Sequence, residues 1–291
     1  MKKAIQGFTL IELLVVIAII SVLVSIMVPA MSQVRTLARQ ALSMNNKKVV
    51  VTGVTNYALD HSDRYPDSVA TIGLEDAYWN WQEPTMMTGY RKRAPRLNRS
   101  MSAYLKRYIN DADTVYCPNA PAKYRYLDES WEAGDTWDNP ETPPTQDPVV
   151  GTFCFYWGYI GYLEDRDSPF RGPTSLLGRS GQSSLLVTDY FGYNHWRSQQ
   201  SFGSCERLPD ANVTAETWIS APYWSESSES QGYLESLGIK LQAGYVDGHV
   251  ETYHPTKTIS MKVSITADGS VPYPDGVGPG EFYLPFNGVY Q

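Results

Sequence analysis

The sequence has few of the residues that metal centres and acid–base catalysis rely on, with only four histidines and three cysteines among 291 residues. It also lacks the Gly-x-Ser-x-Gly, His-Glu-x-x-His, phosphate-loop and dinucleotide-binding patterns that mark common enzyme classes. Its formal net charge is −7, whereas nucleic-acid-binding proteins typically carry an excess of basic residues. We therefore expect no enzymatic activity, no catalytic residues, no cofactor and no nucleic-acid partner.

Charge is almost absent from residues 5–29, where Glu12 is the single ionisable residue, and no basic residue lies between Lys3 and Arg35. A helix of about 20 apolar residues spans the core of a bilayer. A carboxylate inside such a span costs roughly 2–4 kcal/mol and marks a functional site that needs a partner. We expect this partner to be the free α-amino group of a neighbouring copy, exposed by cleavage after Gly7.

The N-terminal segment resembles the cleavage and methylation segment of type IV pilins and type II secretion pseudopilins. The resemblance rests on Lys2, Lys3, the run 7–12 (GFTLIE) and Pro29. It implies that a prepilin peptidase cuts after Gly7 and methylates Phe8, the new N-terminal residue. It also implies an assembly role for Glu12, the fifth residue of the mature chain, and a helix kink at Pro29, the twenty-second.

The resemblance implies a structural subunit whose partners are prepilin peptidase, copies of itself or other pilin-like subunits, an inner-membrane assembly platform and the lipid bilayer. It places the chain once through the bacterial inner membrane, with the leader in the cytoplasm and the C-terminal head outside. Charge alone does not decide this orientation, because basic residues flank both ends of the apolar segment. A secretory signal peptide or a plain anchor explains neither Glu12 nor the Gly7–Phe8 junction.

The expected domains are a leader at 1–7, a helix over 8–62 with 8–31 in the membrane, and a head over 63–291. Apolar residues at helical spacing follow the span and predict an amphipathic half docked on the head. These residues are Met31, Val34, Leu37, Ala38, Ala41 and Leu42. One long helix and a globular head make the lollipop architecture that pilin-like proteins adopt.

The head carries the alternation and turn signals of β structure. Residues 241–246 and 249–254 flank Asp247-Gly248, which predicts a hairpin with a type I′ turn. Residues 184–191 are typical of a buried strand, and 258–266 of a half-buried one. With the helix packed on one face, these strands predict an α+β fold with a mainly antiparallel sheet and long loop insertions.

Motifs in the head are similar to those of a large-head group of bacterial pilin-like proteins, defined by a histidine followed nine residues later by Asp-Gly. The matching segments are 45–47, 115–118, 156–159, 185–189 and 245–250. The histidine itself is absent because Leu237 stands at its position, so the motif is degenerate.

Cysteines and possible metal ligands leave several alternatives open. The three cysteines are Cys117, Cys154 and Cys205, which permit one disulfide. The sequence does not show which two would pair, or whether all three are reduced. We expect no metal at Asp247, His249 and His254, since the turn already explains the aspartate. Calcium at the C-terminal acidic residues matches no known ligand spacing: Asp268, Asp275 and Glu281.

Two blocks of opposite charge lie in the head: seven basic residues in 84–110 and nine acidic residues in 126–165. Each is typical of a solvated loop, the second of a mobile insertion, but together they would suit contacts between filament subunits. We expect the tail, 275–291, to be irregular. The alternative function is a pilin-anchored surface or tip protein whose head binds glycan or another polymer. Its candidate aromatic surface comprises Trp79, Trp81, Trp131, Trp137, Trp196, Trp218 and Trp224.

Overall fold

The structure of the protein is a computed structural model in which two compact units, Met1–Ala41 and Leu42–Gln291, are each described by themselves. The described residues are 9–70, 84–88, 100–118, 120, 126–137, 149–163, 169–178, 180–193, 240–263 and 280–289. Gly7, Phe8 and Leu237 lie outside them.

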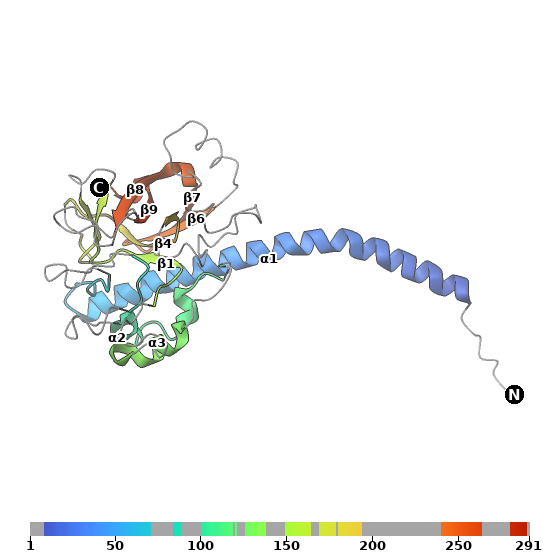
Figure 1. The fold of residues 1–291 in the computed structure, drawn as a ribbon, viewed down its shortest axis with the longest axis horizontal. Helices are drawn as coiled ribbons and strands as arrows, with labels where there is room; N and C mark the ends of the chain where they lie inside the picture. Colours follow the sequence, from blue (N-terminus) through green and yellow to red (C-terminus); the bar gives the residue numbers. More distant parts are fainter. Residues whose placement is uncertain are drawn as a thin grey trace, which may run out of the picture. The chain divides into compact units, whose positions relative to one another are not determined.

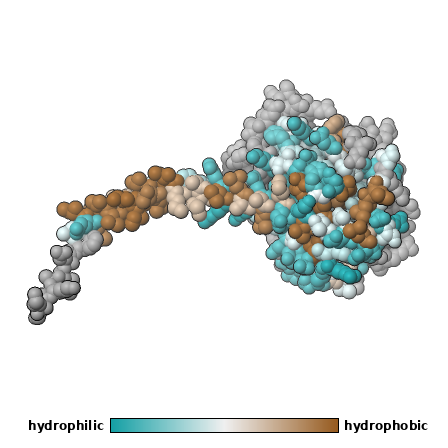
Figure 2. All heavy atoms as spheres, turned by 180° about the vertical axis from the view of Figure 1, so that it is seen from behind, coloured by the Kyte–Doolittle hydropathy of each residue, from teal (hydrophilic) through white to brown (hydrophobic). Residues whose placement is uncertain are grey.

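Helix α1 (Leu10–Asp60) is 51 residues long and begins in the first unit. Its large apolar side chains from Leu10 to Val28 are each at least 45% exposed. Figure 2 shows this stretch as a continuous apolar surface. In the part of the chain that the structure describes, α1 is the one helix long and apolar enough to cross a membrane.

The C-terminal part of α1 forms the centre of the second unit. Its buried residues recur every three or four positions and so share one face of the helix: Ser43, Lys47, Val50, Val51, Gly53, Val54 and Ala58. The expected amphipathic stripe over 31–42 is therefore wrong in position, because large apolar residues such as Met31 and Leu42 are exposed and the buried face begins at Ser43. The Val49-Val50-Val51 run is helical despite its weak propensity, because two of its side chains are core residues.

The head contains short helices and antiparallel strands (Figure 1). The helices are α2 (Met101–Leu105), α3 (Leu127–Ala133) and α6 (Phe286–Val289), with 3-10 turns η3 (Ala112–Val115), η4 (Gly134–Thr136) and η6 (Pro255–Lys257). The strands are β1 (Phe153–Phe155), β2 (Ile160–Leu163), β3 (Pro169–Arg171), β4 (Leu185–Asp189), β5 (Gly192–Tyr193), β6 (Leu241–Tyr245), β7 (Val250–Tyr253), β8 (Thr258–Val263) and β9 (Gly280–Pro285).

The described strands form two sheets, ordered β1-β4-β6-β7 and β3-β2-β8-β9-β5. All their pairings are antiparallel, which confirms the α+β prediction, although one sheet was expected rather than two. Strands β4 and β6 are buried at every position and lie at the centre of the first sheet.

Two glycines show where α1 fits between the first sheet and the short helices. A Cβ atom on Gly244 of β6 would lie 2.7 Å from the Val51 side chain, so this face of α1 is in close contact with the sheet. A Cβ atom on Gly53 would lie 2.7 Å from Ile109, just after α2. The C-terminal part of α1 is thus enclosed on both sides within the second unit (Figure 1).

The turn between β6 and β7 differs from the predicted type I′ turn. Of its residues only Gly248 has positive φ, at 88°, whereas a type I′ turn needs two such residues. The Gly248 amide donates to the Tyr245 carbonyl at 2.9 Å, and the Tyr245 amide to the His249 carbonyl at 3.1 Å. This is the pattern of a turn followed by a glycine bulge, with three residues, 246–248, between the hydrogen-bonded Tyr245 and His249.

Two stretches expected to be irregular contain regular structure. The acidic stretch includes α3, β1 and β2, whose residues Leu127, Trp131 and Phe153 are core residues. The tail includes β9 and α6, and β9 pairs with β8 over its full length. Both expectations relied on polar composition, which does not reveal that a few apolar residues in each stretch complete the core.

Candidate functional site

The N-terminus of α1 is closed by a reciprocal pair of side chains, Thr9 and Glu12. The Thr9 amide and hydroxyl donate to Glu12 Oε2 at 2.8 and 2.7 Å, and the Glu12 amide donates to Thr9 Oγ1 at 3.3 Å. This is a capping box, in which a threonine before the helix and a glutamate three residues later satisfy exposed amides. The negative carboxylate also lies at the positive end of the helix dipole.

The capping box modifies the interpretation of Glu12. We expected its partner to lie outside the segment, but Thr9 of the same chain supplies hydrogen bonds to the carboxylate. Both bonds end on Oε2 of the carboxylate. Thr9 brings no charge, and an ion-pair partner from a neighbouring chain stays a prediction.

Pro29 lies inside α1. Proline has no amide hydrogen to donate to the carbonyl four residues earlier. The Ser32 hydroxyl donates to the Pro29 carbonyl at 2.8 Å. The chain therefore loses one helical hydrogen bond at this point, and the predicted kink would arise there.

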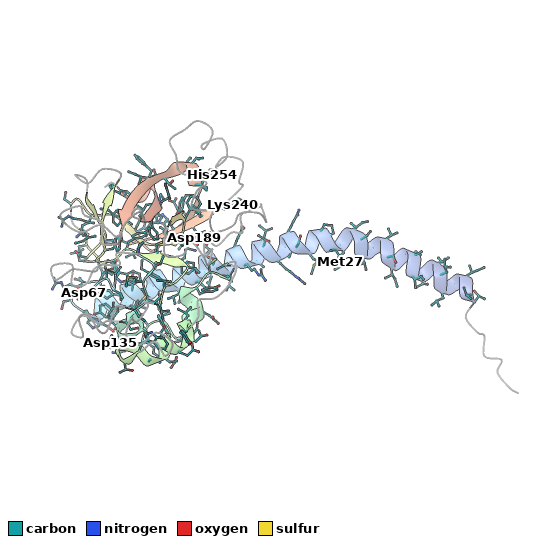
Figure 3. All side chains as sticks on the ribbon, viewed as in Figure 1. Met27, Asp67, Asp135, Asp189, Lys240 and His254 are labelled. Atoms are coloured by element: carbon teal, nitrogen blue, oxygen red, sulfur yellow. The ribbon has the colours of Figure 1, made fainter. Side chains whose placement is uncertain are left out.

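An ion pair that the sequence did not predict lies in the second unit. Lys47 Nζ on α1 lies 2.6 Å from Asp189 Oδ1 at the end of β4, and the two side chains are 0% and 2% exposed. Lys47 Nζ also donates to Ser43 Oγ at 2.9 Å and to Gln242 Oε1 at 3.2 Å, and it lies 4.0 Å from the centre of the Phe153 ring. Figure 3 labels Asp189 beside α1.

The electrostatics of this pair are dominated by burial. Removal from water lowers the pKa of Lys47 and raises the pKa of Asp189, although each charge partly offsets the shift of the other. The Gln242 amide donates to Asp189 Oδ2 at 2.7 Å and further favours the carboxylate. Each buried ion costs several kcal/mol of desolvation, so loss of one partner would be strongly destabilising.

Both members of the pair lie in motifs that the resemblance singled out, 45–47 and 185–189. Nothing in the spacing connected them, since the two residues are 142 positions apart. A lysine with polar neighbours is normally exposed, so its position in the sequence gave no indication of burial.

The cysteines follow one of the alternatives left open. Cys117 is disulfide-bonded, whereas Cys154 is a buried cysteine that is not in a disulfide. Pairs that include Cys154 are therefore excluded, and so is full reduction. Cys205 lies outside the described residues.

The considered metal ligands are engaged in turn structure. Asp247 Oδ1 accepts from the His249 amide at 3.0 Å and contacts the ring nitrogen Nδ1 at 2.5 Å, whereas His254 caps η6. Neither histidine lies on a strand, contrary to expectation. No group of three possible ligands occurs among the residues described. Asp268 and Asp275, considered for calcium, fall outside that set.

The two charge blocks meet within one chain. Lys106 Nζ lies 2.6 Å from Glu132 Oε2, and the Ser100 amide donates to Asp135 Oδ1 at 2.7 Å. Figure 3 labels Asp135. The two blocks are thus in contact within one head. The Lys106–Glu132 pair is exposed, and such a pair contributes about 0–1 kcal/mol. Arg107 of the basic block is exposed. The other five basic residues of that block lie outside the described ranges: Arg91, Lys92, Arg93, Arg96 and Arg99.

The tryptophans proposed for a binding surface are only partly described. Trp131 is 3% exposed and belongs to the core, and Trp137 is half-buried against it. This contradicts the suggestion that Trp131 is a surface residue. The others lie in segments not described: Trp79, Trp81, Trp196, Trp218 and Trp224.

Comparison with known families identifies one segment. Residues 2–28 match the prokaryotic N-terminal methylation motif. The match includes Gly7, Phe8, Thr9 and Glu12, and it supports a type IV pilin-like precursor that is processed by prepilin peptidase and assembles with pilin subunits. No curated protein and no solved structure matches the chain.

Proposed function

We propose that the chain is a structural subunit of a type IV pilus or a type II secretion pseudopilus. The observation that carries the proposal is the methylation motif at 2–28, together with a helix whose apolar stretch holds a single carboxylate, Glu12 in the first turn. An apolar helix of this kind needs lipid or other helices around it, which supports a place first in the membrane and then among the helices of a filament.

Processing would occur at the junction of Gly7 and Phe8. The peptidase would remove 1–7 and methylate the new N-terminal amine of Phe8. Residues 8–31 would then lie in the inner membrane until assembly, and 8–62 would form the helical stalk. Residues 63–291 would form the head.

The head would lie outside the cytoplasm. A disulfide at Cys117 supports this location, since disulfides persist in oxidising compartments and are rare in the cytosol. The basic residues on both flanks of the span give no contrary preference.

Assembly would use the carboxylate of Glu12. In a filament the α-amine of Phe8 from a neighbouring subunit would pair with Glu12, and the capping box would hold the carboxylate toward the helix N-terminus. Pairing would select the axial offset between subunits, since a mismatched neighbour would leave two charges in an apolar environment.

The test is the composition of purified surface or secretion filaments. We expect intact subunits that begin with N-methyl-phenylalanine and lack 1–7, at an abundance that fits a filament body. Filaments without this chain, or a chain that retains its leader, would contradict the proposal. The alternative of a polymer-binding tip protein predicts a scarce subunit instead, and the burial of Trp131 weakens it.

A further inference from the structure

An amine and a carboxyl group are in contact inside the head, where solvent does not reach them. Lys47 Nζ lies 2.6 Å from Asp189 Oδ1, and the exposed fractions of the side chains are 0% and 2%. Because Oδ1 is bonded to Cγ, the nitrogen lies beside the carbon with which it would react. Such proximity converts a reaction between two molecules into a unimolecular one.

We propose that Lys47 and Asp189 form an intramolecular isopeptide bond that links helix α1 covalently to the end of strand β4. Because the two reacting groups are already in contact inside the head, the reaction requires no access from solvent and no enzyme.

The reaction is a condensation that releases one water. One proton of the Lys47 ammonium passes to Asp189 Oδ1, which gives an amine and a carboxylic acid. The Nζ lone pair attacks Cγ, and the Cγ–Oδ1 bond breaks. Oδ1 leaves as water with the transferred proton and a second proton from Nζ, which retains one hydrogen as the amide. Nothing is oxidised or reduced.

The surrounding groups suit each step. The Gln242 amide donates to Asp189 Oδ2 at 2.7 Å, so it would stabilise the negative charge that develops on this oxygen as the tetrahedral intermediate forms. Ser43 Oγ, at 2.9 Å, and Gln242 Oε1, at 3.2 Å, accept the remaining Nζ protons and orient the amine.

Burial favours both the reactants and the product. It lowers the pKa of Lys47 and raises the pKa of Asp189, so the neutral amine and the neutral acid are more accessible than in water. The amide removes two buried charges permanently. Water is kept out on one side by the Phe153 ring, 4.0 Å from Nζ, and the buried Tyr253 lies near Asp189.

The experiment is mass spectrometry of the full chain, purified in detergent, reduced and denatured. We expect a mass one water lower than the sequence of the processed chain requires. Tryptic digestion should give one linked product that joins 40–48 to 180–197, because trypsin does not cleave after an acylated lysine. The linked chain should also migrate faster than Lys47→Arg in a denaturing gel, as an internal link keeps it more compact.

Lys47→Arg is the matched control, since the guanidinium keeps the positive charge but does not form this amide. Loss of water also occurs when Asp-Gly sequences cyclise, and the chain has three: 247–248, 268–269 and 275–276. A water deficit that persists in Lys47→Arg would come from these sequences and overturn the proposal. A wild-type chain of full mass would overturn it equally, because it would show an ion pair and no covalent bond.

Discussion

The dual role of Glu12 leads to a prediction in which helix capping and charge pairing can be separated. Glu12→Gln keeps an acceptor oxygen at the same position, so the capping box with Thr9 can persist, but it removes the charge. Thr9→Val does the opposite, because it removes the hydroxyl that makes two of the three hydrogen bonds and leaves the carboxylate in place.

The magnitudes differ enough to be distinguished. Loss of a capping hydroxyl costs about 0.5–2 kcal/mol, here confined to the first turn of a helix of 51 residues. Removal of the carboxylate makes membrane insertion easier by roughly 2–4 kcal/mol. We therefore expect Glu12→Gln to be cleaved and anchored normally but to lose filament assembly, as Glu12→Val should, whereas Thr9→Val should assemble at reduced yield.

The assay is the amount of sheared filament relative to total cell-associated subunit, with the mass of each variant checked for cleavage and methylation. Thr9→Ser is the matched control because it keeps the hydroxyl. Wild-type filament yield from Glu12→Gln, together with loss of assembly in Thr9→Val, would refute the reasoning. Glu12 would then act as a helix cap, and its charge would have no role in the choice of neighbour.

Three further variants test processing and the head. Gly7→Val should block cleavage and leave a heavier membrane-bound precursor, and a mature chain of normal mass would contradict the peptidase site. Asp189→Ala should lower the free energy of unfolding by about 3–5 kcal/mol, because Lys47 would remain buried without a counter-ion; denaturant unfolding followed by tryptophan fluorescence would measure it, with the exposed Asp67→Ala as control. Gly53→Ala should destabilise by about 1–3 kcal/mol despite a better helix former, since its methyl group would lie 2.7 Å from Ile109; a stability increase would show that Ile109 moves aside.

Part of the head could be predicted because the signals were local. Residues 184–191 and 241–254 showed apolar strands and an Asp-Gly turn, and β4, β6 and β7 lie there. The turn type was wrong because the register of two strands selects between a tight turn and a bulged one, and register depends on contacts across the sheet. Segments with polar composition were misjudged when a few buried side chains, such as Trp131, decided their structure.

The sequence by itself determined the N-terminal part of the protein. A helix in an apolar environment satisfies its own backbone hydrogen bonds, so composition and length are sufficient to define it, and Glu12 stands out because no other charge surrounds it. Only the tertiary structure showed that Lys47 is buried and that it contacts Asp189. That contact depends on how α1 packs against β1, β4 and β6, and packing brings together residues whose separation along the chain carries no information about their distance in space.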